Sequence, residues 1–343
     1  MTTYYSTFTS GLQDVVNNAL SQLLSDVKID LLLDGLVIYR SNKPIQFIEQ
    51  IQFFNNTFLL LYLFKDLGKN SVAFMMDTIL KKPQSIRIPG WALKNSISFR
   101  IMASEENQTI AVNKDTLARL EAFFSHRLRL KVNRSKPDVE VWFLKRSEGY
   151  GFVGIRITRK TANQKNLQKG ELKPELANIL CLIAEPRNGI VFLDPFAGSG
   201  AIPIEWARNF PYTEVIASDS SKEVVNQLRD KVSELGFRLT VERWDAQNLN
   251  AVKDGSIDRI VTDPPWGIYT SQGTKVLEKL YFETLMEFSR ILKNSGVLVM
   301  LTGQKDVFER ILKDVPEMVL TNKYDILVSG KKAAVYKIRK QKH

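Results

Sequence analysis

The second half of the sequence contains the stretch Gly189-Ile190-Val191-Phe192-Leu193-Asp194-Pro195-Phe196-Ala197-Gly198-Ser199-Gly200, which determines the fold class. An apolar run leads into an acid and a Gly-x-Gly loop, and the apolar spacing at Ile202, Ile204 and Ala207 predicts that a helix follows at once. A strand, a glycine-rich loop and a helix in this order hold a nucleotide-like cofactor at the carboxyl end of the first strand of a doubly wound sheet. We therefore expect an α/β domain with a Rossmann-like, doubly wound sheet.

The stretch disfavours NAD as the cofactor, because Pro203 stands where the dinucleotide fingerprint has its third glycine. Asp194, at the strand end, is well placed to meet the amino group of a methionine moiety. Asp219 ends a second apolar run nineteen residues after Gly200, where a carboxylate binds the ribose hydroxyls of NAD or of S-adenosylmethionine. Asp245 follows a third apolar stretch and can accept from an adenine amine. Each acid alone could equally be a helix cap or a turn residue, but four acids in register, with Asp263 as the fourth, favour S-adenosylmethionine.

A second motif, Asp263-Pro264-Pro265-Trp266, ends the apolar run 257–262. Each proline fixes φ and removes a backbone N–H, so this turn offers carbonyl oxygens without competing donors. The Asp263 carboxylate and the Pro264 carbonyl can accept from the two protons of an exocyclic NH2 group, while Trp266 offers a face for the ring. The two acceptors would localise the lone pair of the amine and direct it at a methyl donor. Taken alone, the motif could also be a strand that ends in a Pro-Pro turn with an exposed tryptophan.

Residues 189–303 resemble class I S-adenosylmethionine-dependent amino-methyltransferases, with the glycine-rich stretch, Asp219, Asp245 and the segment 263–266 at the family's motif positions. The stretch 170–181, GELKPELANILC, resembles the entry to the catalytic domain of THUMP-containing guanosine-N2 methyltransferases. The segments 98–101, SFRI, and 135–141, SKPDVEV, are similar to the start and to the Pro-Asp-Val strand of the THUMP module. Many members have Tyr or Phe where this chain has Trp266, which keeps stacking possible but changes the fit of the pocket.

This resemblance implies methyl transfer from S-adenosylmethionine to the N2 amine of a guanosine in structured RNA, with the acceptor stem of tRNA as the best single expectation. The expected catalytic residues are Asp263, Pro264, Pro265 and Trp266. The expected cofactor-binding residues are Asp194, Pro195, Phe196, Ala197, Gly198, Ser199, Gly200, Asp219, Ser220, Asp245, Ala246 and Asp263. An rRNA guanine, a DNA adenine or cytosine amino group, and a non-enzymatic RNA-binding role remain as alternatives.

The net charge of +11 over 343 residues lies almost entirely in the first half of the chain. Residues 1–170 hold 24 Lys and Arg against 14 Asp and Glu, whereas residues 171–343 hold 24 against 23. A basic module joined to a near-neutral catalytic part is expected where the first binds a phosphate backbone. The run 126–136 alternates basic and apolar residues, so as a strand it would direct its charges to one face. The residues expected to contact RNA are Arg127, Arg129, Lys131, Arg134 and Lys136; the alternative is a solvated basic surface without a partner.

The composition disfavours several other classes of site. Cys181 is the single cysteine, so an internal disulfide or a Cys-rich zinc site is excluded and a reducing compartment is expected. The two histidines are His126 and the final residue, which disfavours a Ser-His-Asp hydrolase, and the sequence has no P-loop pattern. No signal-peptide pattern is evident, and the most apolar run, 58–64, is too short to span a bilayer. We expect a cytoplasmic monomer that needs neither a membrane nor a metal.

The pattern of elements predicts three domains. Residues 1–64 are expected to form a small α+β, ferredoxin-like domain, with a helix at 12–24 and a buried strand at 58–64. Residues 65–158 are expected to form the THUMP domain, and the polar, lysine-rich segment 159–169 the linker. In residues 170–343 strands and helices alternate, as in a doubly wound sheet, and segments 324–328 and 333–338 predict a final hairpin with an antiparallel last strand.

Overall fold

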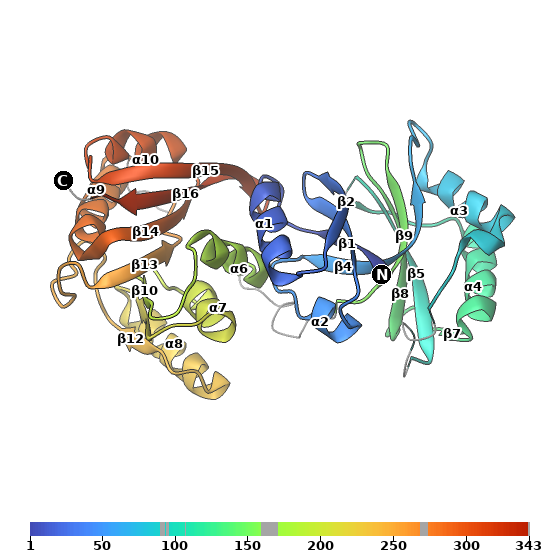
Figure 1. The fold of residues 1–343 in the computed structure, drawn as a ribbon, viewed down its shortest axis with the longest axis horizontal. Helices are drawn as coiled ribbons and strands as arrows, with labels where there is room; N and C mark the ends of the chain where they lie inside the picture. Colours follow the sequence, from blue (N-terminus) through green and yellow to red (C-terminus); the bar gives the residue numbers. More distant parts are fainter. Residues whose placement is uncertain (90–92, 94–95, 107, 159–170, 268–273, 342–343) are drawn as a thin grey trace. The chain divides into compact units, whose positions relative to one another are not determined.

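A computed structural model describes residues 1–343 except 90–92, 94–95, 107, 159–170, 268–273 and 342–343 (Figure 1). The chain divides into two compact units. Unit 1 comprises Met1–Thr7 and Leu24–Arg159, and unit 2 comprises Phe8–Leu23 and Lys160–His343. The predicted linker at 159–169 lies outside the described residues, and the domain boundaries at residues 64 and 158 stay predictions.

Unit 1 contains one sheet of nine strands in the order β2-β3-β1-β4-β9-β8-β5-β6, with β7 paired to β5. Most neighbours are antiparallel, while β5 runs parallel to β8 and to β7. The strands are β1 (Thr2–Thr7), β2 (Lys28–Leu33), β3 (Leu36–Ser41), β4 (Asn56–Phe64), β5 (Ser98–Glu105), β6 (Gln108–Thr109), β7 (Lys131–Val132), β8 (Val139–Lys145) and β9 (Gly151–Arg156). The helices are α2 (Ile45–Glu49), α3 (Val72–Lys81), a short 3-10 turn η1 (Pro83–Ser85) and α4 (Lys114–Leu128).

The run 126–136 does not form the single strand that would have directed its charges to one face. Helix α4 continues to Leu128, Arg129 ends it with a left-handed φ of 57°, and only Lys131–Val132 is extended. The reason is visible in the helical spacing of the buried residues Leu120, Phe124 and Leu128, which recur every fourth position and extend the helix past residue 126. The basic residues of this run therefore lie on a helix end, a turn and a short strand, and do not share one face of a strand.

Unit 2 contains the remaining elements, and its helix α1 packs against α6. The helices are α1 (Gln13–Leu23), α6 (Pro174–Ile183), α7 (Ala201–Asn209), α8 (Lys222–Leu235), α9 (Thr274–Ile291) and α10 (Lys305–Leu312). The strands are β10 (Val191–Asp194), β11 (Glu214–Ser218), β12 (Thr240–Glu242), β13 (Ile257–Thr262), β14 (Leu292–Thr302), β15 (Met318–Val328) and β16 (Lys331–Lys340).

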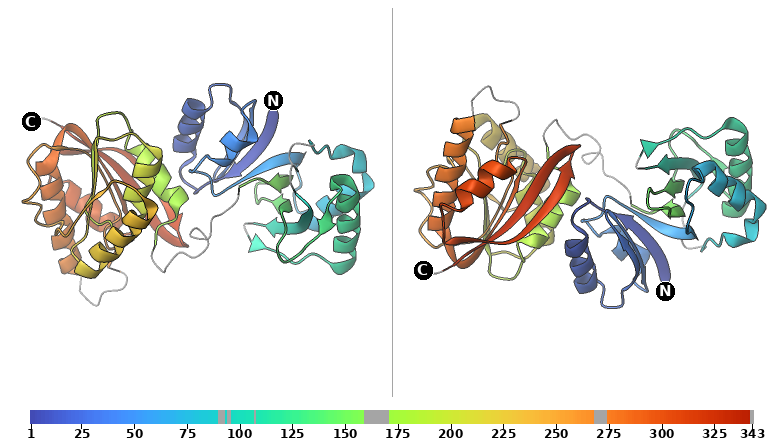
Figure 2. Two further views of the ribbon diagram at one scale, coloured as in Figure 1. Left: turned by 90° about the horizontal axis from the view of Figure 1, so that it is seen from below. Right: turned by 90° about the horizontal axis from the view of Figure 1, so that it is seen from above.

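The sheet of unit 2 has the order β12-β11-β10-β13-β14-β16-β15. The first five strands are parallel, and β16 is antiparallel to both β14 and β15. The expected doubly wound sheet with an antiparallel last strand is confirmed, and the final hairpin is longer than expected (Figure 2, right). The chain winds outward in one direction through β11 and β12 and in the other through β13 and β14. The topological switch point therefore lies between β10 and β13, where ligands bind in such sheets.

Helices cover this sheet in two layers. One apolar cluster contains Phe288 of α9 and Phe308 of α10 packed on buried strand residues such as Ile260 and Leu298. A second cluster contains Ile204 of α7 with residues of α8 and β11. Cys181 is buried in α6, as a small hydrophobe would be. Within the part of the chain that is described, no helix is both long and apolar enough to cross a membrane.

Candidate active site

The carboxyl ends of β10 and β13 are joined by a direct side-chain bond at the switch point. The hydroxyl of Thr262, the last residue of β13, donates to Asp194 Oδ1 over 2.7 Å. Asp194, the last residue of β10, also accepts from the backbone N–H of Phe196 over 3.2 Å and is 1% exposed. Asp263 follows Thr262 directly, so the sheet brings the two predicted acids of the cofactor and amine sites to adjacent strand ends.

The electrostatics of this corner favour a positively charged ligand. Burial raises the pKa of Asp194 to about 7, and the nearby negative charges of Asp263 and Asp219 add to the rise. Loss of hydration likewise raises the pKa of Asp263 to about 7. A cation placed between these carboxyls would stabilise their ionised forms and would itself be held by them.

The loop between β10 and α7 is shaped by its glycines and tied to β11. The N–H of Gly198 donates to Asp219 Oδ2 over 3.2 Å, and the N–H of Ala197 donates to the carbonyl of Ser218 over 2.9 Å. Gly200 caps α7 with a φ of +81°, and a Cβ there would stand 2.3 Å from a methyl carbon of Leu228. The left-handed backbone conformation favours glycine at this position, and a larger residue would also have to displace the Leu228 methyl group. Of the other predicted loop residues, Pro195 and Phe196 form the turn after β10, and the carbonyl of Ser199 accepts from Lys231 Nζ over 2.8 Å.

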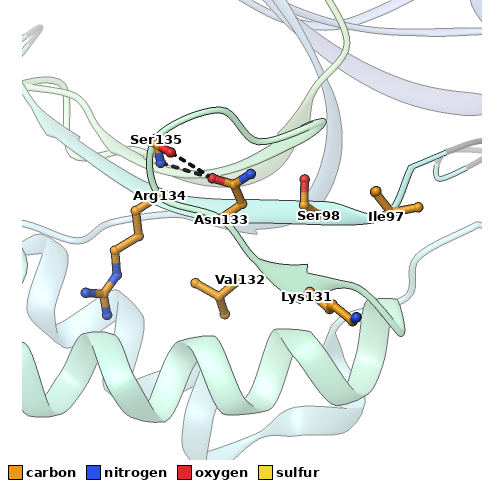
Figure 3. Close-up of a pocket in the computed structure, with 7 residues that line it drawn as sticks. All are labelled: Ile97, Ser98, Lys131, Val132, Asn133, Arg134 and Ser135. Atoms are coloured by element: carbon orange, nitrogen blue, oxygen red, sulfur yellow. Dashed lines mark hydrogen bonds between the residues drawn. The ribbon is translucent and has the colours of Figure 1, made fainter.

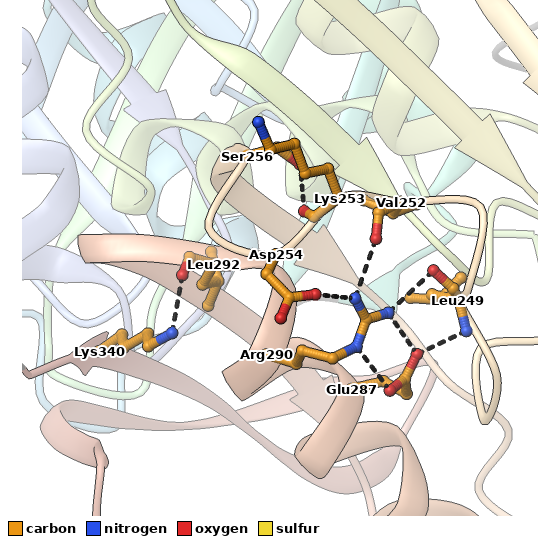
Figure 4. A network of polar contacts seen from close by, with 9 residues as sticks. All are labelled: Leu249, Val252, Lys253, Asp254, Ser256, Glu287, Arg290, Leu292 and Lys340. Atoms are coloured by element: carbon orange, nitrogen blue, oxygen red, sulfur yellow. Dashed lines mark hydrogen bonds and ion pairs between the residues drawn. The ribbon is translucent and has the colours of Figure 1, made fainter.

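The third predicted acid, Asp245, lies in the loop after β12, exposed, with Ala246 buried beside it. This loop is fixed from α9 by Arg290 (Figure 4). Arg290 donates to the carbonyls of Leu249 and Val252 over 2.9 Å each, and Glu287 Oε2 accepts from the N–H of Leu249 over 2.6 Å. The paired carboxylate of Glu287 raises the pKa of Arg290 further above its ordinary value, so Arg290 stays charged. The remaining predicted residue, Ser220, is exposed after β11, and its carbonyl accepts from Arg243.

The segment 263–266 lies at the end of β13 with Pro264 buried, Pro265 exposed, and Asp263 and Trp266 half-buried. The indole Nε1 of Trp266 donates to Asp263 Oδ1 over 2.8 Å. This hydrogen bond favours the ionised form of Asp263, although loss of hydration has the larger effect on its pKa. The chain thus folds back on itself over four residues and orients the carboxylate.

Four residues around this segment were not predicted from the sequence. They are Thr262, already described, Tyr281 and Gln304, which donate to the backbone carbonyls of Pro265 and Trp266, and Thr302, whose hydroxyl oxygen lies 2.8 Å from that of Tyr281. Thr302 is the last residue of β14, the strand beside β13, as Thr262 is the last residue of β13, and this shared place at a strand end was the available signal, although Met300 lies opposite Thr262 in the register. Tyr281 lies within α9 with no motif around it, and helical spacing marks it only as a core residue.

The predicted RNA-binding residues lie in unit 1 and differ in whether their side chains make contacts within the protein. Arg127 donates to the carbonyls of Pro83 and Ile86, and Arg134 pairs with Glu121 over 2.7 Å. The remaining three are exposed, and among the described residues no intramolecular bond is recorded for their side chains: Arg129, Lys131 and Lys136.

A surface pocket of about 600 Å³ in unit 1 contains two of these predicted residues (Figure 3). Its lining combines cationic, amide and hydroxyl groups with exposed apolar side chains: Ile97, Ser98, Lys131, Val132, Asn133, Arg134 and Ser135. The pocket belongs to the basic unit and lies outside the switch point of unit 2.

Comparison with known proteins agrees with this geometry. Residues 162–331 match the model of the UPF0020 family, described as an RMKL-like methyltransferase domain. The tRNA (guanine(6)-N(2))-methyltransferase THUMP3 of Mus musculus is 29% identical over 231 residues, covering 61% of this chain and 45% of the mouse protein. The tRNA (guanine(6)-N2)-methyltransferase of Thermus thermophilus is 27% identical over 233 residues, covering 66% of this chain and 69% of that protein.

Among solved structures, TrmN from Thermus thermophilus matches with a TM-score of 0.81 at 23% identity, over 99% of this chain and 100% of that chain. This match shows a common fold. The chain spans less than half the length of the mouse relative. The family match covers nearly all of unit 2 after its first helix, including every element that carries the site described above. Residues 162–331 are therefore similar to the RMKL-like methyltransferase domain of the UPF0020 family.

Proposed function

We propose that this chain transfers a methyl group from S-adenosylmethionine to the exocyclic N2 amine of a guanosine in structured RNA, and that the RNA is tRNA. The observation that carries the proposal is the junction at the switch point. There the segment 263–266 and Asp194 are joined through the Thr262 hydroxyl bond. The acceptors for an amine thus lie directly beside the acid that would meet the cofactor.

The residues present fit the cofactor. Bound S-adenosylmethionine would supply an activated methyl group on a positively charged sulfonium. Asp194, buried and with a raised pKa, would accept from the amino group of the methionine moiety. Asp219 accepts from the Gly198 N–H through Oδ2 and from the Ser221 N–H through Oδ1, and the remaining lone pairs of its carboxylate would take the ribose hydroxyls. Asp245 and Ala246 would contact the adenine.

The segment 263–266 would hold and orient the target amine. The Asp263 carboxylate and the Pro264 carbonyl would accept hydrogen bonds from its two N–H groups, which directs the lone pair of nitrogen toward the methyl donor. The one proton that nitrogen loses when it gains the methyl group would pass to the ionised Asp263 carboxylate. Trp266 stacks on the base after the nucleotide has turned out of its helix. Most of the rate enhancement would come from this positioning, because the donor is already activated. Asp263 must be ionised for this role, so the reaction depends on the pKa of its carboxyl.

The basic unit 1 supplies the RNA-binding surface in this proposal, with residues 65–158 as the RNA-binding module. Exposed Arg129, Lys131 and Lys136 would contact phosphates, whereas Arg127 and Arg134 also hold the module together. The names of the two curated relatives favour tRNA, and a guanosine in the acceptor stem is the proposed target. Lys131→Glu combined with Lys136→Glu should raise KM for RNA about tenfold or more and weaken its salt dependence, with kcat little changed. Lys69→Glu, an exposed site of the same unit away from the pocket, is the matched control.

The test of the reaction is incubation with methyl-labelled S-adenosylmethionine and separate pools of unmodified tRNA, rRNA and duplex DNA, followed by nucleoside mass spectrometry. We expect label as N2-methylguanosine from tRNA. Asp263→Ala should abolish it, whereas Asp314→Asn, an exposed acid after α10, should leave it unchanged. Label in DNA adenine or cytosine, or in rRNA alone, would contradict the proposal.

A further inference from the structure

The backbone of the Asp263-Pro264-Pro265-Trp266 segment has few groups that can donate hydrogen bonds to its surroundings. Pro264 and Pro265 have no N–H, so neither can donate a hydrogen bond that fixes the turn to its surroundings. What remains on the backbone of these two prolines are carbonyl oxygens, which only accept. A precise position for this segment therefore depends on donors supplied by other elements.

Two elements supply such donors. Tyr281 of α9 donates its hydroxyl proton to the carbonyl of Pro265 over 2.9 Å. Gln304, which follows β14, donates from Nε2 to the carbonyl of Trp266 over 2.5 Å. Tyr281 is 2% exposed, and burial raises the pKa of its hydroxyl well above the ordinary value, so it stays a donor.

Thr302 connects the two donors and fixes the direction of the chain of bonds. Tyr281 Oη and Thr302 Oγ1 are 2.8 Å apart, and the backbone N–H of Gln304 donates to Thr302 Oγ1 over 3.0 Å. Because the single proton of Tyr281 goes to a carbonyl, Thr302 must be the donor to Tyr281. The bonds therefore run in one direction, from the Gln304 N–H through Thr302 and Tyr281 to Pro265, and each strengthens the next.

Gly303 fixes the side chain of Trp266. A Cβ at residue 303 would stand 2.6 Å from Cε3 and 3.1 Å from Cδ2 and Cζ3 of the indole, so the benzene ring of Trp266 occupies that space. In this position the indole Nε1 reaches Asp263 Oδ1. The backbone of the segment is thus held by two side chains, and its aromatic side chain rests on a third residue.

We propose that Tyr281 and Gln304 are positioning residues that clamp the segment 263–266, and that Gly303 seats Trp266 so that it orients the carboxylate of Asp263. This inference rests on the proposed function, because the clamp would place the acceptors of the target amine. The clamp acts after both substrates are bound, so its loss should appear in kcat more than in KM or in cofactor affinity.

The experiment uses the full chain with Tyr281→Phe, Gln304→Ala and Gly303→Ala, and Tyr336→Phe as control. Tyr336 is a fully buried tyrosine of the same unit whose hydroxyl donates to Glu309 Oε1 over 2.6 Å and not to the segment. For Tyr281→Phe and Gln304→Ala we expect kcat to fall about 10-fold to 100-fold with KM for tRNA and Kd for S-adenosylmethionine changed less than about 3-fold. Gly303→Ala should also move the acidic limb of the pH–kcat profile to higher pH, because Asp263 loses the indole donor. Tyr336→Phe should keep the wild-type kcat and profile.

Amide hydrogen exchange does not depend on methyl transfer, so it tests the clamp separately from the proposed function. Hydrogen exchange at the amides of Trp266 and Gly267 should be faster in Tyr281→Phe and Gln304→Ala than in the wild type, and unchanged in Tyr336→Phe. If the wild type methylates no guanosine, the proposed function fails, but the exchange comparison still tests the clamp. Wild-type kcat in Tyr281→Phe, an equal loss in Tyr336→Phe, or unchanged exchange in both clamp variants would overturn the inference.

Discussion

Asp194→Asn should stabilise the ligand-free protein at pH 8 while it abolishes cofactor binding. The carboxyl of Asp194 is 1% exposed, and its pKa is raised from 3.8 to about 7. A raised pKa in the folded state means that folding favours the protonated acid, so stability is lost as pH rises from about 4 through 7. The raised pKa thus lowers folding stability by ~4 kcal/mol at pH 8 and by ~1.5 kcal/mol at pH 5, compared with a carboxyl whose pKa is unchanged by folding.

The asparagine keeps an oxygen for the bonds from Thr262 and Phe196, but its amide N–H groups need acceptors, which costs about 1–2 kcal/mol if they find none. The net expectation is a gain of about 2–3 kcal/mol at pH 8 and no gain at pH 5. Denaturant unfolding at both pH values measures this difference. Asp258→Asn is the control, because Asp258 is also buried but pairs with Lys293 over 2.6 Å, so its loss should destabilise at both pH values.

Addition of S-adenosylmethionine should reverse the order of the two proteins at pH 8. The wild type gains stability by mass action, whereas the variant lacks the negative charge that meets the amino group and gains little. A variant that is less stable than the wild type at pH 8 would refute the account of Asp194 as a destabilising acid kept for its ligand. A variant with full cofactor affinity would refute its assignment to the cofactor.

The remaining predictions concern the rest of unit 2. The kcat/KM for methyl transfer should rise with pH about tenfold per unit up to about 7 and then level off, since Asp263, with its pKa raised to about 7, must be ionised; a flat profile between pH 5 and 8 would contradict this role. Arg290→Ala should weaken S-adenosylmethionine binding about tenfold by calorimetry, because it frees the loop that carries Asp245, while Arg310→Ala, an exposed arginine on α10, should not. Glu205→Gln should stabilise the protein by about 2–3 kcal/mol at pH 8 but not at pH 4.5. The reason is that burial raises the pKa of Glu205 from 4.5 to about 7, so its charged form disfavours folding. Equal stability of the variant and the wild type at pH 8 would refute this.

The parts of the fold that follow from local pattern were predictable from the sequence. The strand that ends at Asp194, the glycine-rich loop and the final antiparallel hairpin were each indicated by consecutive residues, and they were found. An alternating pattern over a few residues fits a strand and also a helix end followed by a turn, so the run 126–136 did not distinguish the two structures. The buried residues of α4 show that the run begins as the end of a helix.

The contacts around the segment 263–266 could not be predicted, because they join residues far apart in sequence through the sheet. Tyr281 reaches Pro265 only because α9 packs on the sheet, and Gln304 reaches Trp266 only because β14 lies beside β13. No local pattern distinguishes such a tyrosine from a core residue. The motif thus identified the acceptors of the site, whereas the donors that hold them required the tertiary structure.

The tryptophan at position 266 and the glycine at position 303 are best understood together. A Phe or Tyr at position 266 would present a ring without an N–H to orient the neighbouring acid. The indole of Trp266 provides that donor, but its ring then fills the space where a Cβ at residue 303 would stand. A tryptophan in this orientation therefore requires glycine at 303, and an alanine there should be tolerated only when Trp266 is replaced by the smaller Phe. The double variant Trp266→Phe with Gly303→Ala should accordingly be more active than Gly303→Ala alone, and a double variant that is less active would show that the two positions are not coupled through this contact.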